Sequence, residues 1–152
     1  MAQKTFVSEI LTASDVNLYL AGEGGAWTSW SPVVTQNVNV TITNTRSRLA
    51  RYGRTIHFQI DVEVTGTGTG ANDIFVSLPV TAASSSVVMG TGWIFDSSSG
   101  IAYAGPVQTT TTNVMKVLAT GTGGGFYGSQ TMTVGLASVD IIRLTGTYEA
   151  AT

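Results

Sequence analysis

The clearest hydrophobic pattern in the chain is the segment from Thr55 to Thr65, which reads TIHFQIDVEVT. Its even-numbered positions from 56 to 64 are all apolar, and the odd-numbered positions between them are all polar. Strict alternation of this kind predicts a β-strand with one buried face and one solvated face. At about 3.3 Å per residue the strand spans roughly 30 Å, so it can cross a small domain from end to end. We expect it near the middle of an antiparallel sheet.

Short apolar runs separated by turn residues continue the β pattern from Ala26 onward. Gly53, a serine-rich stretch at 97–100 and a threonine-rich stretch at 109–112 mark turns. About eight to ten strands fit two packed sheets with Greek-key or jelly-roll connections. The predicted fold is therefore an all-β, antiparallel, jelly-roll-like β-sandwich. Besides the central strand, strands are expected over residues 38–43, 46–52, 74–80, 87–95, 101–108, 113–119, 130–134 and 141–148.

The segment before residue 26 has the one pattern typical of a helix. Thr12 and Asp15 have the spacing of a capping box, and Gly22 is a natural helix end. A helix of about two turns is not stable alone, so we expect it to dock on its own sandwich, a neighbouring copy or a larger assembly. We divide the chain into an N-terminal anchor segment, 1–25, and a β-sandwich domain, 26–152. The apolar residues of the helix are Val16, Leu18, Tyr19 and Leu20.

The composition indicates a surface with few charged side chains. Charged residues make up 11% of the chain, well under half the usual value of about 25%. The 24 threonines, 18 glycines and 14 serines therefore fill most solvent-facing strand positions. Such a surface can be simply soluble, or it can be buried against identical copies, where few charges need to be desolvated. We expect an oligomer.

The composition also argues against several classes of protein. The chain has no cysteine, so it has no disulfide, thiolate metal site or thiol nucleophile. A net charge of −2 argues against a nucleic-acid-binding protein. The N-terminus lacks the apolar core of a signal peptide, and no run of 18 apolar residues occurs. We expect a protein that is neither membrane-spanning nor conventionally secreted, and that needs no cofactor.

Asp61 and Glu63 are the acidic pair to weigh for catalysis. They share one face of the central strand, so their carboxylates can lie about 7 Å apart, near the separation that an inverting glycosidase needs. No other acidic cluster or aromatic cleft is indicated nearby, so we expect no catalytic residue and no enzyme. His57 shares the face but has no second histidine or cysteine to complete a metal site. We expect it at the surface or at an interface.

Four of the seven basic residues lie within nine positions. They are Arg46, Arg48, Arg51 and Arg54. Guanidinium groups suit planar anions, so a phosphate or acidic-glycan site is one interpretation. We favour ion pairs with strand carboxylates such as Asp61 and Glu63, within one subunit or between subunits.

The aromatic residues of the second half are candidates for ligand contact. Trp93, Tyr103, Phe126 and Tyr127 all lie near glycines, and exposed rings of this kind can stack on sugar faces. In a small sandwich, large aromatic side chains usually fill the core or an interface, which is the competing interpretation. The GGGFYG stretch predicts a loop tip with an exposed aromatic pair, Phe126 and Tyr127.

Three stretches of the chain resemble segments of one family. They are LTASDVNLYLAG at 11–22, RLARYGRTIHFQIDVEVTGTGTG at 48–70, which is followed by SLPV at 77–80, and LTGTYEA at 144–150. Together they resemble the small β-sandwich tail and appendage proteins of tailed bacteriophages, especially of actinobacteriophages. The motifs are short and structural, so the resemblance implies a virion protein and transfers no catalytic residue.

The resemblance implies a jelly-roll-like sandwich, commonly trimeric, on the tail or head surface and often facing host glycans. It makes the opening helix the attachment end, with Val16, Leu18, Tyr19 and Leu20 as docking residues. Trp27 and Trp30 then lie where the anchor meets the sandwich. Many relatives carry long additional segments that this chain lacks, which leaves room for a small spike or a head decoration protein.

The sequence thus leads to a non-enzymatic virion structural protein, made in the bacterial host cytoplasm and assembled into the particle. We expect a tail or appendage spike or receptor-binding module, a homotrimer that contacts other virion proteins and a host surface glycan, but neither nucleic acid nor membrane. One alternative is a capsid decoration or head-fibre protein. A second is a carbohydrate-binding module or depolymerase.

Overall fold

The computed structural model describes residues 26–70, 72–118 and 135–152, and in these residues the chain is all β-strand and turn, with no helix. The predicted helix, the anchor segment and the predicted strand at 130–134 lie outside the described residues. None of the described residues belongs to a helix long and apolar enough to cross a membrane.

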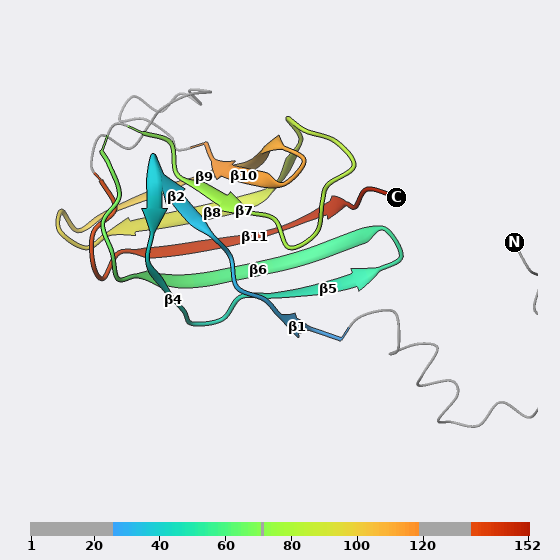
Figure 1. Cartoon of the computed structure of the whole chain (residues 1–152), viewed down its shortest axis with the longest axis horizontal. Helices are drawn as coiled ribbons and strands as arrows, with labels where there is room; N and C mark the ends of the chain where they lie inside the picture. The colour runs from blue at the N-terminus through green and yellow to red at the C-terminus, as the bar shows by residue number, and fades with distance from the viewer. Residues whose placement is uncertain (1–25, 71, 119–134) are drawn as a thin grey trace, which may run out of the picture.

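The described residues form eleven strands in one hydrogen-bonded sheet (Figure 1). Its order is β1-β5-β6-β11-β8-β9-β10-β7-β2-β3, with β4 also paired to β6, and every pairing is antiparallel. The strands are β1 (Thr28–Ser29), β2 (Val34–Gln36), β3 (Val38–Val40), β4 (Ile42–Asn44), β5 (Arg48–Tyr52), β6 (Thr55–Val64), β7 (Phe75–Ser77), β8 (Val88–Asp96), β9 (Ile101–Thr111), β10 (Val114–Val117) and β11 (Ile141–Glu149).

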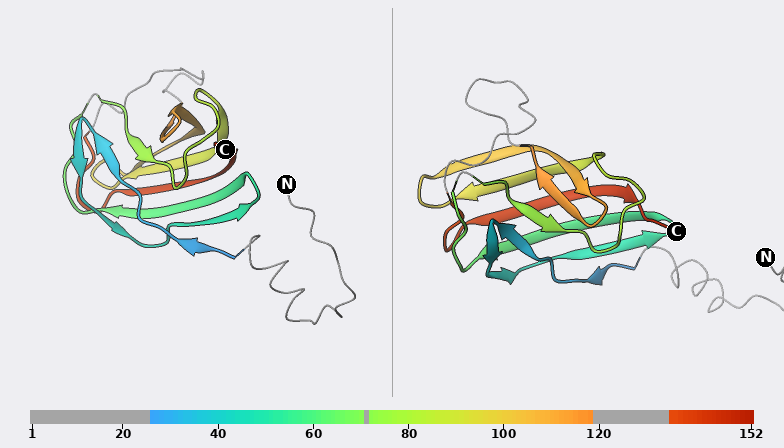
Figure 2. Two further views of the ribbon diagram at one scale, coloured as in Figure 1. Left: turned by 45° about the vertical axis from the view of Figure 1, so that its right-hand side comes forward. Right: turned by 45° about the horizontal axis from the view of Figure 1, so that its top comes forward.

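The sheet curls back on itself, so that β7, β10 and β2 lie across from β6 and β11 (Figure 2). The predicted single strand at 38–43 is split at Thr41, because β3 pairs with β2 at one end of the sheet and β4 pairs with β6 near the other. The Thr41 carbonyl accepts hydrogen bonds from the backbone N–H groups of Thr65 and Gly66, which fixes the crossing. The all-β, antiparallel prediction is confirmed. One curled sheet supplies both layers, where two separate sheets were expected.

Strand β6 is the central strand that its alternation predicts. Its five apolar side chains are at most 1% exposed, and it is paired with β4 and β5 on one side and β11 on the other. Apolar residues from both halves of the curl join these side chains in one core cluster. Phe58 is the largest fully buried side chain among the described residues, and its ring lies 6.0 Å from that of Tyr148.

Close packing between β6, β11 and β8 depends on a glycine. A Cβ at Gly146 would lie 2.9 Å from two ring carbons of Phe58 and 2.4 Å from the Met89 carbonyl oxygen. Real Cβ atoms do not approach a backbone oxygen so closely, so a side chain here would displace the β11–β8 pairing.

The serine-rich turn at 97–100 is confirmed as the hairpin between β8 and β9. The buried Asp96 carboxylate accepts hydrogen bonds from the hydroxyls of Ser98 and Ser99, at 2.6 and 2.8 Å, and from both backbone N–H groups. These bonds, led by the Ser98 hydroxyl, outweigh burial and lower the pKa of Asp96 below 3.8. Gly100 ends the turn at a φ of 69°, where a side chain would be strained.

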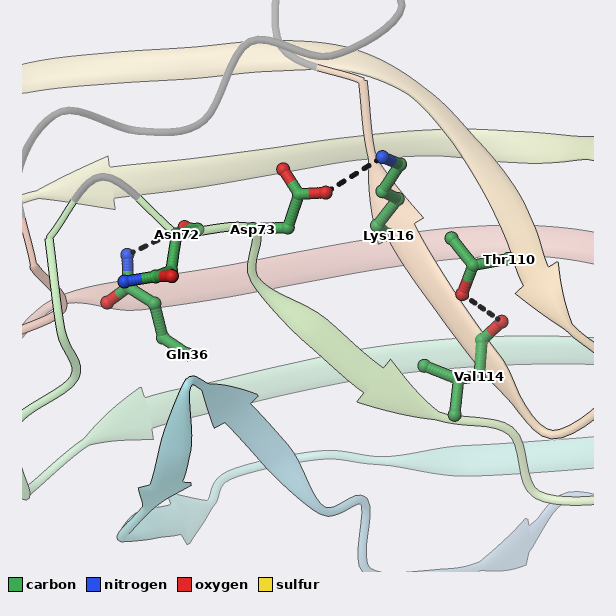
Figure 3. A network of polar contacts seen from close by, with 6 residues as sticks. All are labelled: Gln36, Asn72, Asp73, Thr110, Val114 and Lys116. Atoms are coloured by element: carbon green, nitrogen blue, oxygen red, sulfur yellow. Dashed lines mark hydrogen bonds and ion pairs between the residues drawn. The ribbon is translucent and has the colours of Figure 1, made fainter.

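Polar side chains join the loops at one end of the sheet (Figure 3). Fully buried Gln36 accepts a hydrogen bond from the Leu136 N–H at 2.7 Å and donates one to the Asn72 carbonyl at 3.2 Å. Close by, Lys116 Nζ on β10 lies 2.9 Å from Asp73 Oδ2. This corner therefore connects β2 and β10 to residues 68–69, 72–73 and 136.

Candidate functional site

The outward face of β6 and its neighbours carries the candidate site. Because side chains alternate along a strand, the polar residues of β6 all lie on the face opposite the core. The registers place Asp61 of β6 beside Arg143 of β11, and Arg143 beside Trp93 of β8. Three side chains that are far apart in sequence therefore form one row across the outer face.

This row is held together by specific contacts. Arg143 Nε donates to Asp61 Oδ1 at 3.2 Å, and the guanidinium carbon lies 5.3 Å from the centre of the Trp93 ring. The Trp93 ring also stacks on Phe95, at 5.7 Å between centroids and 9° between planes. The indole is thus engaged by its own neighbours and holds Arg143 in place.

A second arrangement of the same kind lies on β5, β6 and Trp27, the residue just before β1. The Arg48 guanidinium lies 4.5 Å from the centre of the Trp27 ring, and its Nε donates to Gln59 Oε1 at 2.9 Å. Gln59 and Asp61 are successive outward residues of β6. Two tryptophan–arginine pairs therefore lie on either side of the middle of β6.

Between them lie two shallow hollows, of about 580 and 400 Å³, that adjoin at Thr91 and Thr145, and we call the two together the outer groove. At one end stand Trp27 and Tyr52, 48% and 50% exposed, with His57 between the tyrosine and the threonines. His57 Nδ1 is 2.9 Å from Thr147 Oγ1, and its ring packs edge-on against Tyr52. The outer groove is lined by Trp27, Ala50, Tyr52, His57, Phe58, Gln59, Ile60, Asp61, Gly90, Thr91, Gly92, Trp93, Ala104, Arg143, Leu144, Thr145, Gly146 and Thr147.

The groove carries few charged side chains. Among its described lining residues the carboxylate and the guanidinium are those of Asp61 and Arg143, which are paired with each other, and the Arg48 guanidinium adds one cation beside Trp27. Residues 26–70, 72–118 and 135–152 contain no cluster of three or more histidine, aspartate or glutamate side chains suited to a metal ion. Hydroxyl, amide and aromatic groups are what the groove offers a ligand.

Of the aromatic residues predicted to contact a ligand, those that the structure describes do not lie together. Trp93 lies on the outer face, whereas Tyr103 is paired with inward-facing Ile94 and packs against the core. The two rings therefore lie on opposite faces of the sheet, so Tyr103 does not join Trp93 in one site. Phe126 and Tyr127 lie outside the described residues.

Asp61 and Glu63 meet none of the four clustered arginines through a side-chain ion pair in the described part of the chain. Asp61 pairs with Arg143, because β11 brings that residue directly beside it. Glu63 is exposed opposite Ile141. Pairing between subunits stays a prediction.

The four arginines have separate surroundings within the chain. Arg54 pairs with Glu149 at 3.1 Å, and Arg51 Nε donates to the Gly53 carbonyl at 2.8 Å. Arg48 is held by Trp27 and Gln59 as described above, and the exposed Arg46 side chain makes no hydrogen bond or ion pair with the described residues.

The predicted docking residues are only partly described. Val16, Leu18, Tyr19 and Leu20 lie outside the described residues. Trp27 belongs to the outer groove, while half-buried Trp30 packs against the core cluster. The Trp30 indole N–H is buried and has no hydrogen-bond partner in the described part of the chain.

Sequence reasoning missed Arg143, Tyr52 and the threonine floor. Arg143, Thr145 and Thr147 occupy alternate positions of a recognised strand, which signals that they share its outward face. Their position beside Asp61 and Trp93 depends on the register of β11 between β6 and β8, which no local pattern specifies.

No protein-family model matches the chain, and neither curated proteins nor solved structures include a significant match to it.

Proposed function

We propose that this protein is a non-enzymatic adhesion module of a bacteriophage tail or appendage, a small receptor-binding spike in which the curled sheet serves as the jelly-roll-like sandwich. The observation that carries the proposal is the outer groove, an open aromatic and hydroxyl-lined surface on an otherwise sparsely charged sheet. Ligand sites commonly combine aromatic walls with a few well-placed polar groups. The resemblance of residues 11–22, 48–70 and 144–150 to phage appendage proteins supplies the biological setting.

The proposed mechanism is multivalent. A shallow groove buries little of a ligand, so one copy binds weakly. Several copies held on one particle, first as a homotrimer and then by particle symmetry, turn weak single contacts into tight adhesion to a cell surface. The low charge of the strands suits burial between copies, because few ions need to be desolvated.

The test combines the mass of the protein in solution with binding to cells. Light scattering on a size-exclusion column is expected to give three times 15.8 kDa. The labelled trimer is expected to adsorb to some members of a panel of intact bacteria that includes actinobacteria. A protein that adsorbs to none of them contradicts the adhesion proposal whatever its mass, and a monomer contradicts the proposed trimer.

The alternative function is capsid decoration, favoured by apolar side chains that are exposed away from the groove. Val33, Val88, Ile101 and Val139 are each at least half exposed, and contacts with a shell would cover such residues. Binding of the purified protein to empty heads that lack it tests this alternative, and failure to bind counts against it.

A further inference from the structure

We infer that the outer groove is a binding site for an uncharged oligosaccharide that lies across the strands from Trp27 to Trp93. This inference rests on the proposed function for its setting, and it adds the ligand class, the site and the direction in which the ligand lies.

The Trp27 end of the groove provides aromatic surface. Trp27 and Tyr52 are each about half exposed, and both line the larger hollow. A sugar ring has one face made mainly of C–H groups, which packs favourably on an aromatic ring. The Arg48 guanidinium beside Trp27 and the His57 ring beside Tyr52 hold these two aromatic side chains in place.

The other end of the groove provides hydrogen bonds. Asp61 accepts from Arg143 Nε through one oxygen only, so the second carboxylate oxygen and the terminal guanidinium nitrogens make no hydrogen bond with described residues. An acceptor and a donor side by side match neighbouring sugar hydroxyls, each of which both donates and accepts. Trp93 acts here as a positioning residue, because its ring packs against Arg143.

The floor of the groove is small and hydroxyl-rich. Thr91 and Thr145, both exposed, lie at the junction of the two hollows, and Ala104 and Thr147 extend the floor on either side. From β1 to β8 the sheet order runs across four strand spacings, which at about 4.8 Å each amounts to roughly 19 Å. The groove therefore has room for a chain of several sugar units rather than for one.

The charge of the groove selects the ligand class. The Arg48 guanidinium is engaged by the Trp27 ring and by Gln59, and Asp61 and Arg143 cancel each other, so an acidic glycan would have to compete with these partners for a guanidinium. An uncharged chain leaves this pair intact. The inferred ligand is accordingly a neutral oligosaccharide.

The experiment measures binding of the intact chain to uncharged hexasaccharides, namely cellohexaose, maltohexaose and chitohexaose in its N-acetylated form, with hexagalacturonate as the acidic comparison. Chemical-shift changes in two-dimensional NMR at millimolar sugar report binding and its location. We expect saturable binding of at least one uncharged hexasaccharide, with shifts at Thr91, Thr145 and Trp27. No uncharged ligand, or tighter binding of hexagalacturonate, overturns the inference.

Variants locate the site. Thr91→Tyr fills the junction and is expected to weaken binding at least tenfold, whereas Thr43→Tyr, at an exposed threonine of β4 outside the groove, is expected to leave it unchanged. Trp27→Ala is expected to weaken binding about three- to tenfold, the usual range for loss of an aromatic contact. Its control, Ile101→Ala, truncates another half-exposed apolar residue and is expected to have no effect. Equal binding by Thr91→Tyr and Thr43→Tyr overturns the inference.

The same variants separate this inference from the proposed function. If the wild-type trimer adsorbs to cells and Thr91→Tyr adsorbs equally well, adhesion stands and the groove is not its site. If the groove binds a hexasaccharide but the protein adsorbs to no cell, the inference stands and the adhesion proposal fails.

Discussion

At the scale of single residues, Tyr148 anchors the end of β11 to the loop after β7. Its hydroxyl donates to the Val80 carbonyl at 2.6 Å and accepts from the Val80 N–H at 3.1 Å. Tyr148→Phe removes both bonds and leaves two backbone groups without their partner, so we expect a loss of about 1–3 kcal/mol in unfolding free energy. Urea denaturation measures it. Tyr52→Phe, at an exposed tyrosine, is the control and is expected to change stability little.

The same tyrosine gives the protein an alkaline limit. Burial raises the pKa of Tyr148 from 10.0 to about 12. Because the pKa of the Tyr148 hydroxyl is higher in the folded state than in the unfolded state, the hydroxyl ionises first in the unfolded state as pH rises. The stabilisation from this group is therefore complete below pH 10 and is lost as pH rises towards about 12. Urea midpoints across this window are expected to fall in the wild type and to fall less in Tyr148→Phe; parallel curves would contradict this.

Gly146 gives a second residue-scale prediction. A methyl group here would meet the Met89 carbonyl oxygen and the Phe58 ring, neither of which can move without disturbing the sheet or the core. We expect Gly146→Ala to lower the unfolding free energy by about 1–3 kcal/mol, the usual cost of overpacking. Thermal unfolding followed by circular dichroism measures it, and an unchanged midpoint would show that β8 and β11 can separate at no cost.

At the scale of elements, the β8–β9 hairpin depends on the Asp96 carboxylate. Asp96→Ala leaves the backbone N–H groups of Ser98 and Ser99 without their acceptor, so we expect a loss of about 1–3 kcal/mol. Because the folded pKa of Asp96 is lowered below 3.8, its stabilisation is present above that pH and is lost as pH falls further. Acid titration of the unfolding midpoint measures this, and a wild type and variant that lose stability in parallel below that pH would contradict it.

The strands also show what the sequence can and cannot predict. β6 follows from its alternation alone, because its core contacts lie on one face along its whole length. A nearby glycine marks both Trp93 and Tyr103 as candidates for ligand contact, but it does not say on which face of the sheet each ring lies. The register of β8 and β9 pairs Tyr103 with inward-facing Ile94 and so places the two rings on opposite faces. The outer groove depends on the pairing of Asp61 with Arg143, 82 residues apart, which only the folded sheet specifies.

At the scale of the whole molecule, the curl makes one core out of one sheet. Strands from both halves contribute to a single buried cluster, and the crossing at Thr41 and the corner at Gln36 fasten the halves together. Neither half can bury its apolar face without the other. The low charge of the chain follows from its many threonine and serine side chains, although the outward positions of β6 itself include His57, Gln59 and Asp61.

A single core predicts a single unfolding transition, even when the hydrogen bonds of Gln36 that join the two layers are removed. Gln36→Ala deprives the Leu136 N–H and the Asn72 carbonyl of their partner in the interior, so we expect about 1–3 kcal/mol of destabilisation. Because both layers share the core, far-ultraviolet circular dichroism and tryptophan fluorescence are expected to shift together to a lower urea midpoint, with coincident curves. Thr69→Ala, at an exposed position of the neighbouring loop, is the control and is expected to keep the wild-type midpoint. Separate transitions for the two probes in Gln36→Ala would mean that the two layers fold as independent units and that the corner, rather than the shared core, holds them together.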